Sequence, residues 1–228
     1  MVEVVDILVE GIADQKFLAD VIISWYGYKI EGEVRDKKDT ILVNETNFKK
    51  AKIKSFEGKD VLETERKKNL LCENLEINIS INKPSLLIFD ADFDFLGNFK
   101  KWNDFKNEFY KDKNTNIFDI FFWPNNQDLG NKVQSDLEYL LFDILCEDKL
   151  MYWSCFDDFD KCVELKFENS YNLCFHDNKT RIFSFLSTFG RESKEVKRNY
   201  FDAEIFNLNP TEKPILKPLK TTLDKYLN

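Results

Sequence analysis

Residues 85–94 read SLLIFDADFD, and they predict the central strand of the protein together with a ligand site. The four apolar residues that follow the serine run without alternation, which is typical of a strand buried on both faces of a mostly parallel sheet. Asp90, Asp92 and Asp94 come next, at every second position. Because open α/β sheets bind ligands beyond the carboxyl ends of such strands, we expect these aspartates at a binding site.

The three carboxylates also indicate what the ligand is. Clustered carboxylates repel one another unless a cation or a set of hydrogen bonds neutralises them. Oxygen ligands of this kind suit Mg²⁺, which keeps several waters and takes one or two carboxylates, and Mn²⁺ can replace it. We therefore predict a divalent-cation site at the end of this strand.

The beginning of the chain predicts a strand followed by a helix. Residues 4–9 (VVDILV) are apolar and mostly β-branched apart from Asp6, and they lead into Glu10-Gly11. In the next segment, apolar residues recur at four-residue spacing, which predicts a helix. Asp14 lies at the N-terminus of this helix, where the helix dipole favours negative charge.

The rest of the sequence predicts further strands and helices of an α/β fold. We expect strands at 41–43 and 117–123, helices at 99–110, 135–145 and 180–189, and weak helical character at 61–75. The lysine runs near residues 49–54 and 66–68 are interpreted as a solvated face rather than as part of a substrate site. We divide the chain into an α/β domain over 1–150 and a helical extension over 151–228, whose last amphipathic segment packs on the same domain.

Composition excludes several classes of protein. The chain has 228 residues and a net charge of −8, which argues against a nucleic-acid binder that works through bulk electrostatics. Its five cysteines have no CxxC spacing, which is typical of reduced intracellular thiols. His176 is the only histidine, so histidine-assisted nucleophilic catalysis could be built only there. The N-terminus carries acids where a signal peptide needs basic residues, and no apolar run is long enough to span a membrane. We therefore expect a cytoplasmic protein.

The acidic motifs together resemble the Toprim domain of topoisomerases, primases and overcoming-lysogenization-defect (OLD-like) nucleases. The resemblance covers about residues 1–150 and rests on Glu10-Gly11, Asp14 and Asp90-x-Asp92. It implies a Rossmann-like Toprim fold, a mostly parallel sheet flanked by helices, and Mg²⁺-dependent phosphodiester chemistry. It assigns catalytic and metal-binding roles to Glu10, Asp90 and Asp92, with Asp14 and Asp94 as auxiliary metal-binding acids. Glu10 is the candidate general acid or base.

Two later residues extend the resemblance. The segment WPNNQDLGN, followed by DLEYLL, looks like small stand-alone Toprim proteins and makes Glu138 a further metal-binding acid. The alternative is structural, because Ser135 and Glu138 have the spacing of a helix capping box. Lys179 resembles the lysine that OLD-like nucleases carry at the start of a helix, where it could stabilise charge on a phosphate. Its alternative is an exposed surface lysine.

The predicted function is Mg²⁺-dependent hydrolysis of nucleic acid, either DNA or RNA. The chain is too short for the additional domains of a topoisomerase or primase and has no GxxxxGK[ST] motif. An ATPase would therefore be a separate partner, as in a bacterial anti-phage defence system. The alternative is a catalytically inactive Toprim-like binding module that acts through a protein partner, which the negative net charge favours. A phosphoryl-receiver domain also uses clustered aspartates, but Glu10-Gly11 does not fit it.

Overall fold

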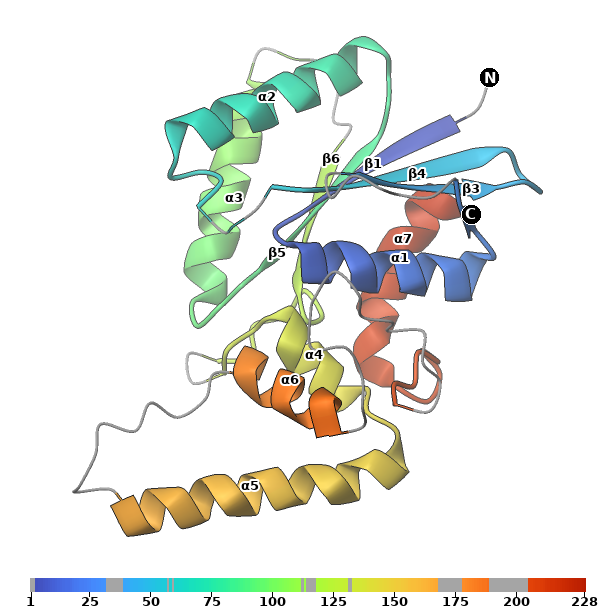
Figure 1. Ribbon diagram of the computed structural model, residues 1–228. Coiled ribbons are helices and arrows are strands. Elements are labelled where there is room, and N and C mark those ends of the chain that lie inside the picture. The colour runs from blue at the N-terminus through green and yellow to red at the C-terminus, as the bar shows by residue number, and fades with distance from the viewer. Residues whose placement is uncertain are drawn as a thin grey trace.

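The computed structural model describes residues 3–31, 39–56, 58, 60–111, 113, 118–130, 133–167, 178–188 and 205–228. These residues form a mixed, mostly parallel six-stranded sheet flanked by helices, which confirms the predicted Rossmann-like α/β class (Figure 1). The strand order is β2-β3-β4-β1-β5-β6. None of the described helices combines the length and the apolar character needed to cross a membrane.

The strands divide into a parallel centre and an antiparallel edge. Strands β4, β1, β5 and β6 are parallel to one another, whereas β3 is antiparallel to β4 and β2 is antiparallel to β3. The strands are β1 (Glu3–Val9), β2 (Lys29–Ile30), β3 (Asp39–Asn44), β4 (Lys49–Ser55), β5 (Ser85–Asp90) and β6 (Phe118–Trp123). The helices are α1 (Ile12–Tyr26), α2 (Glu65–Ser80), α3 (Phe95–Tyr110), α4 (Leu137–Asp143), α5 (Glu147–Phe167), α6 (Asn178–Thr188) and α7 (Lys217–Leu227), preceded by the short 3₁₀ helix η2 (Pro214–Leu216).

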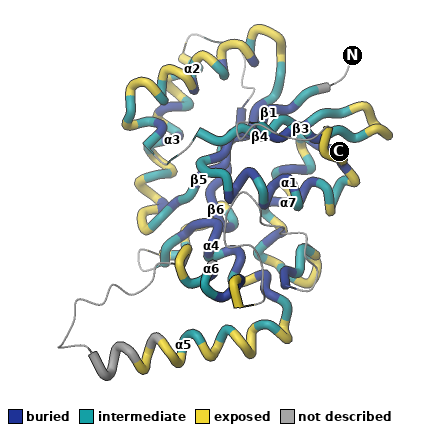
Figure 2. Tube along the Cα trace, in the orientation of Figure 1, coloured by how far each residue is buried: buried dark blue, intermediate teal, exposed yellow. Residues whose placement is uncertain are grey.

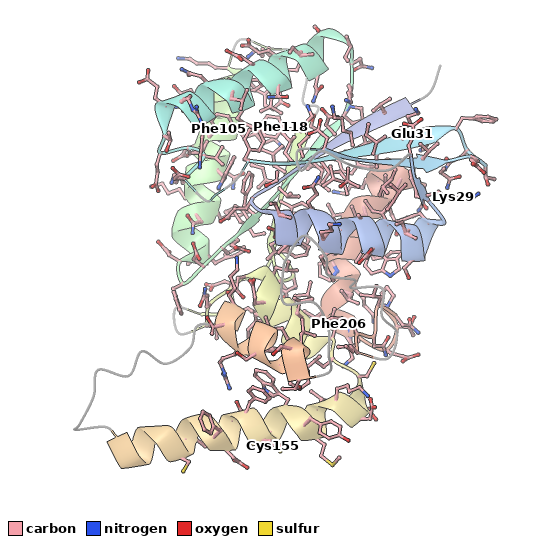
Figure 3. All side chains as sticks on the ribbon, viewed as in Figure 1. Lys29, Glu31, Phe105, Phe118, Cys155 and Phe206 are labelled. Carbon is pink, nitrogen blue, oxygen red and sulfur yellow. The ribbon has the colours of Figure 1, made fainter. Side chains whose placement is uncertain are left out.

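The sheet separates two apolar layers, because successive side chains of a strand point to opposite faces. Leu8 of β1 packs in the layer beneath α2 and α3, while its neighbours Ile7 and Val9 pack in the layer beneath α1 and α7. In the first layer, Phe105 of α3 lies against Phe118 of β6, with ring centroids 6.4 Å apart (Figure 3). Figure 2 shows the buried sheet between helices whose outer faces are exposed.

The lysine run at 49–54 is a strand, which the sequence reading missed. It forms β4 between β3 and β1, with Ala51 and Ile53 fully buried on one face. The lysines alternate with these residues, and on the other face Lys50, Lys52 and Lys54 form ion pairs with acids. Apolar residues alternate with lysines in KKAKIK, as in a strand, but the segment was interpreted as a solvated face because of its lysines. The helix α5 was also missed.

The chain ends in a docked helix, as the amphipathic pattern predicted. The apolar side chains of η2 and α7 are buried in the same core as α1: Leu216, Leu219, Leu223 and Leu227. Polar contacts fix the position of the helix. Tyr26 of α1 donates a hydrogen bond to Asp224 at 2.9 Å, and Tyr226 donates one to Asp119 of β6 at 2.9 Å.

Candidate acidic active site

One pocket collects most of the residues that the sequence singled out. It has a volume of about 530 Å³ and lies where β1 and β5 end. These strands are parallel neighbours, paired from Asp6 opposite Ser85 to Val9 opposite Ile88, so their carboxyl ends meet at the same edge of the sheet. Six of the seven predicted site residues line the pocket: Glu10, Asp14, Asp90, Asp92, Glu138 and Lys179.

The turn at Glu10 is held by the loop that follows β4. The carbonyl oxygen of Glu10 accepts hydrogen bonds from Gly58 N at 3.0 Å and from Ser55 Oγ at 3.3 Å. Phe56 N donates to the carbonyl oxygen of Val9 at 2.9 Å. Ser55 and Gly58 also line the pocket, although the sequence gave no reason to select them. The Glu10 backbone is therefore fixed from the neighbouring strand.

Asp14 is a buried anchor at the start of α1. It is 6% exposed, and its two oxygens accept hydrogen bonds from Gly11 N at 2.9 Å and from Trp123 Nε1 at 2.7 Å. Burial and the negative charge of Glu138 raise the pKa of Asp14 to about 7, although both hydrogen bonds act in the opposite direction. Asp14 therefore ties α1 to β6 and is partly protonated near neutral pH.

Asp90 is the acid of the pocket on which the negative charges of its neighbours act. It is the last residue of β5, and its Oδ1 accepts a hydrogen bond from Leu137 N at 3.2 Å. Burial raises the pKa of Asp90 well above its ordinary value, and the charges of the surrounding acids add to the effect: Asp14, Glu10, Glu138 and Asp136. Acids from three separate segments of the chain therefore interact electrostatically at this position.

Asp92 is held in place through its backbone. Its φ of 50° lies in the left-handed region, which aspartate tolerates better than most residues. Its N–H donates to the Ser135 carbonyl at 3.0 Å, and its own carbonyl accepts from Ser135 N at 2.7 Å. This bridge joins the loop after β5 to the segment that leads into α4.

The prediction for Asp94 is not supported by its position. Asp94 does not line the pocket, and its Oδ1 instead accepts a hydrogen bond from Gly97 N at 2.9 Å as the N-cap of α3. An aspartate three residues before a backbone N–H of the first helical turn is a common capping arrangement. The alternation of side-chain direction that would place Asp90, Asp92 and Asp94 together therefore ends at Asp92, where the left-handed backbone interrupts the extended chain.

Ser135 is not the N-cap of the capping-box alternative, although Glu138 does lie at the N-terminus of a helix, as that alternative predicted. The N-cap of α4 is Asp136, whose Oδ1 accepts a hydrogen bond from Tyr139 N at 2.7 Å. Glu138 lies in the first turn of α4, is 7% exposed and lines the pocket. Asp136 also lines the pocket and was missed, although an aspartate just before an apolar helical run is a recognisable N-cap signal.

Lys179 lies at the start of a helix, and it is also exposed. It is the second residue of α6, its side chain is exposed, and it lines the pocket. It brings a positive charge to a pocket whose other charged lining residues, among those described, are all acids. The only histidine, His176, lies outside the described residues.

The chemistry of the donors fits a divalent cation, although a ready-made ligand set is absent. Within the described ranges, no three acid, histidine or cysteine side chains are grouped as a metal site. Both oxygens of Asp14 are hydrogen-bonded, and Asp90 uses one oxygen for Leu137. The remaining donors are carboxylate oxygens, the ligands that Mg²⁺ and Mn²⁺ prefer. A cation held by Glu10, Asp90 and Asp92 would offset the repulsion that raises the pKa of Asp90.

Removing one of these charges is expected to stabilise the metal-free protein at high pH. Asp14 and Asp90 have raised pKa values, so the folded state holds protons that the unfolded state lacks between about pH 4 and pH 7. Stability should therefore fall as the pH rises through this range. Glu138→Gln should raise the free energy of unfolding at pH 8 by about 1 kcal/mol, the value of just under one pKa unit, and less at pH 5.

Urea denaturation at both pH values, in EDTA, measures this effect. Glu63→Gln is the matched control, because Glu63 is an exposed acid that pairs with Lys101 outside the pocket. An identical pH dependence in wild type and Glu138→Gln would show that Glu138 does not contribute to the repulsion.

Comparisons with protein-family models, with curated proteins and with solved structures found no match to this chain.

Proposed function

We propose that this chain is a Toprim-like, Mg²⁺-dependent nuclease that hydrolyses phosphodiester bonds of DNA or RNA. The observation that supports it most is the convergence of Glu10, Asp90 and Asp92 on one pocket at the ends of two adjacent parallel strands. Glu138 and Lys179 line the same pocket from α4 and α6. Acids remote in the sequence thus line one pocket with a lysine, a set of groups that can support metal-dependent phosphodiester hydrolysis.

In this proposal Glu10, Asp90 and Asp92 hold the cation. Bound Mg²⁺ supplies neutralisation of the scissile phosphate and lowers the pKa of a bound water. Mn²⁺ can serve as a substitute, because it takes the same oxygen ligands. Lys179 contributes a charge that pairs with a non-bridging phosphate oxygen.

In the proposed reaction, an acid of the pocket accepts the proton of the attacking water. Glu10 is the proposed acceptor of the proton from the attacking water, since it lies at the rim of the pocket on a backbone fixed by Ser55 and Gly58. Asp14, whose pKa is raised by burial and by the charge of Glu138, is buried at the start of α1. Its hydrogen bonds to Gly11 and Trp123 give it a positioning role rather than direct contact with substrate.

A second candidate function is a catalytically inactive binding module that acts through a protein partner. The engaged oxygens of Asp14 and the lack of a preassembled three-ligand group among the described residues favour this alternative, as does the net charge of −8. Titration calorimetry separates the two candidates: a nuclease should bind Mg²⁺ or Mn²⁺ through its acidic pocket.

A separate ATPase partner, a role in anti-phage defence and a cytoplasmic location are also part of the proposal. They rest only on the resemblance of the acidic motifs to those of OLD-like nucleases. Co-purification with ATPases encoded beside the gene tests the first of them.

The direct test is cleavage by the purified wild-type chain. End-labelled single-stranded DNA, duplex DNA and RNA are incubated with Mg²⁺, Mn²⁺, Ca²⁺ or EDTA and analysed on denaturing gels. We expect cleavage in Mg²⁺ or Mn²⁺ and none in EDTA. Cleavage that persists in EDTA, or metal binding without cleavage of any substrate, would reject the nuclease assignment.

A further inference from the structure

An exposed apolar surface follows the acidic pocket's Asp92 in the chain. Phe93, Leu96 and Phe99 are 54%, 63% and 43% exposed, and we call them the apolar rim. Phe93 follows Asp92, which lines the pocket, in the loop between β5 and α3. Leu96 and Phe99 are three residues apart near the start of α3 and therefore share one face of the helix. Three large exposed side chains thus occur within seven residues, immediately after an acid of the pocket.

Phe99 of the apolar rim packs against other aromatic rings. The ring of Phe99 stacks on that of Phe95, with centroids 5.8 Å apart and planes inclined by 16°. Both rings contact Phe122 of β6, which is 1% exposed, at 5.7 Å and 6.2 Å. On either side of Phe93, the backbone is fixed by the bridge from Asp92 to Ser135 and by the cap that Asp94 provides to α3.

Because the protein is negatively charged, a nucleic-acid ligand of this surface has to be held by contacts other than charge. A chain with a net charge of −8 repels the phosphates of nucleic acid, and a duplex carries one charge per about 1.7 Å of its axis. Stacking of a base on an aromatic ring does not depend on that charge and requires a base whose face is free. Single strands offer such faces, whereas a duplex hides them. Lys100, exposed beside Phe99, and Lys179 in the pocket provide only local positive charge.

We propose that the nuclease acts on single-stranded nucleic acid and that a base next to the scissile phosphate stacks on Phe93 at the apolar rim. This inference rests on the proposed function, because the strand is positioned by a phosphate in the acidic pocket. Phe93 is then a specificity-determining residue: it supplies the affinity that the charge of the protein does not, and it does so only for unpaired bases.

The experiment compares four substitutions in the full chain. Phe93→Ala and Phe93→Leu remove the ring, Phe93→Tyr retains it, and Phe48→Ala is the matched control. Phe48 is 71% exposed but precedes β4, so it lies at the opposite edge of the sheet from the pocket. Binding of a fluorescein-labelled 12-nucleotide oligothymidylate is measured by anisotropy with Ca²⁺, and cleavage of single strand and duplex is measured with Mg²⁺.

We expect Phe93→Ala and Phe93→Leu to bind the oligothymidylate about tenfold more weakly, the change that corresponds to loss of one stacked base. Phe93→Tyr and Phe48→Ala should bind like wild type, and single strand should be cleaved faster than duplex. Melting temperatures close to the wild-type value would show that all four variants are folded.

Each other result overturns the inference in a recognisable way. Wild-type cleavage that survives unchanged in Phe93→Ala would reject the stacking role and leave the nuclease assignment intact, as would a preference for duplex. Binding that is lost in Phe93→Ala but kept in Phe93→Leu would indicate a general apolar contact, such as one that fits a protein partner. Failure of the wild type to bind or cleave any nucleic acid would reject the proposed function, and this inference with it.

Discussion

Asp90→Asn is expected to lower Mg²⁺-dependent cleavage by about 10²- to 10³-fold, the usual loss when one stabilising group is removed from an active site. Asp90 is the acid on which the charges of Asp14, Glu10, Glu138 and Asp136 all act, so it is the best-placed ligand for a cation that neutralises them. Asparagine keeps an oxygen that can accept the hydrogen bond from Leu137 N, so the contact with α4 remains. The variant should therefore stay folded, and its melting temperature at pH 8 should be at least that of wild type.

The matched control lies four residues further along the chain. Asp94 caps α3 and does not line the pocket, and asparagine caps a helix about as well as aspartate. Asp94→Asn should therefore cleave within about twofold of wild type, since it changes an equal charge in the same loop without touching the proposed ligand set. Denaturing gels and Mg²⁺ titration of both variants measure the difference. Equal activity in Asp90→Asn and Asp94→Asn would contradict the assignment of Asp90.

The sequence predicted the centre of the fold well because the signal there is simple. The unbroken apolar run at the start of 85–94 could be buried only on both faces of a sheet, and it forms β5. The strands β1 and β5 are parallel neighbours in the sheet. With those two strands side by side, the positions of Glu10 and Asp90 follow from chain direction alone.

Other parts of the site depend on contacts that a single sequence does not reveal. Asp92 and Asp94 look equivalent in FDADFD, but the left-handed backbone at Asp92 sends one acid to the pocket and leaves the other as a helix cap. Asp136 was missed because Ser135 beside it offered an equally good cap, and the pairing of Ser135 with Asp92 decided between them. The strand β4 was missed because its lysines are neutralised by acids from other segments, including Asp6.

That ion-pair cluster is expected to contribute more to stability than any other polar group discussed above. The Asp6 side chain is 2% exposed and contacts Lys83, Lys54 Nζ at 3.4 Å and Asn78 Nδ2 at 3.1 Å. Burial alone would raise the pKa of Asp6, but its ion pair with Lys83 and the charge of Lys54 outweigh burial and lower the pKa from its ordinary value. The stabilising contribution of Asp6 is therefore complete above about pH 4 and is lost as the pH falls through its folded-state pKa.

Lys83→Met is expected to lower the free energy of unfolding at pH 7 by about 2–3 kcal/mol. Breaking a buried ion pair from one side typically costs about 3–5 kcal/mol, and Lys54 and Asn78 remain to satisfy part of the Asp6 charge. Urea denaturation measures the change, and Lys29→Met is the control, because Lys29 and Glu45 form a pair in which both side chains are 71% exposed. The control should show no measurable change, since exposed pairs contribute little. Should Lys83→Met be as stable as Lys29→Met, the ion pair between Lys83 and Asp6 would not stabilise the folded protein.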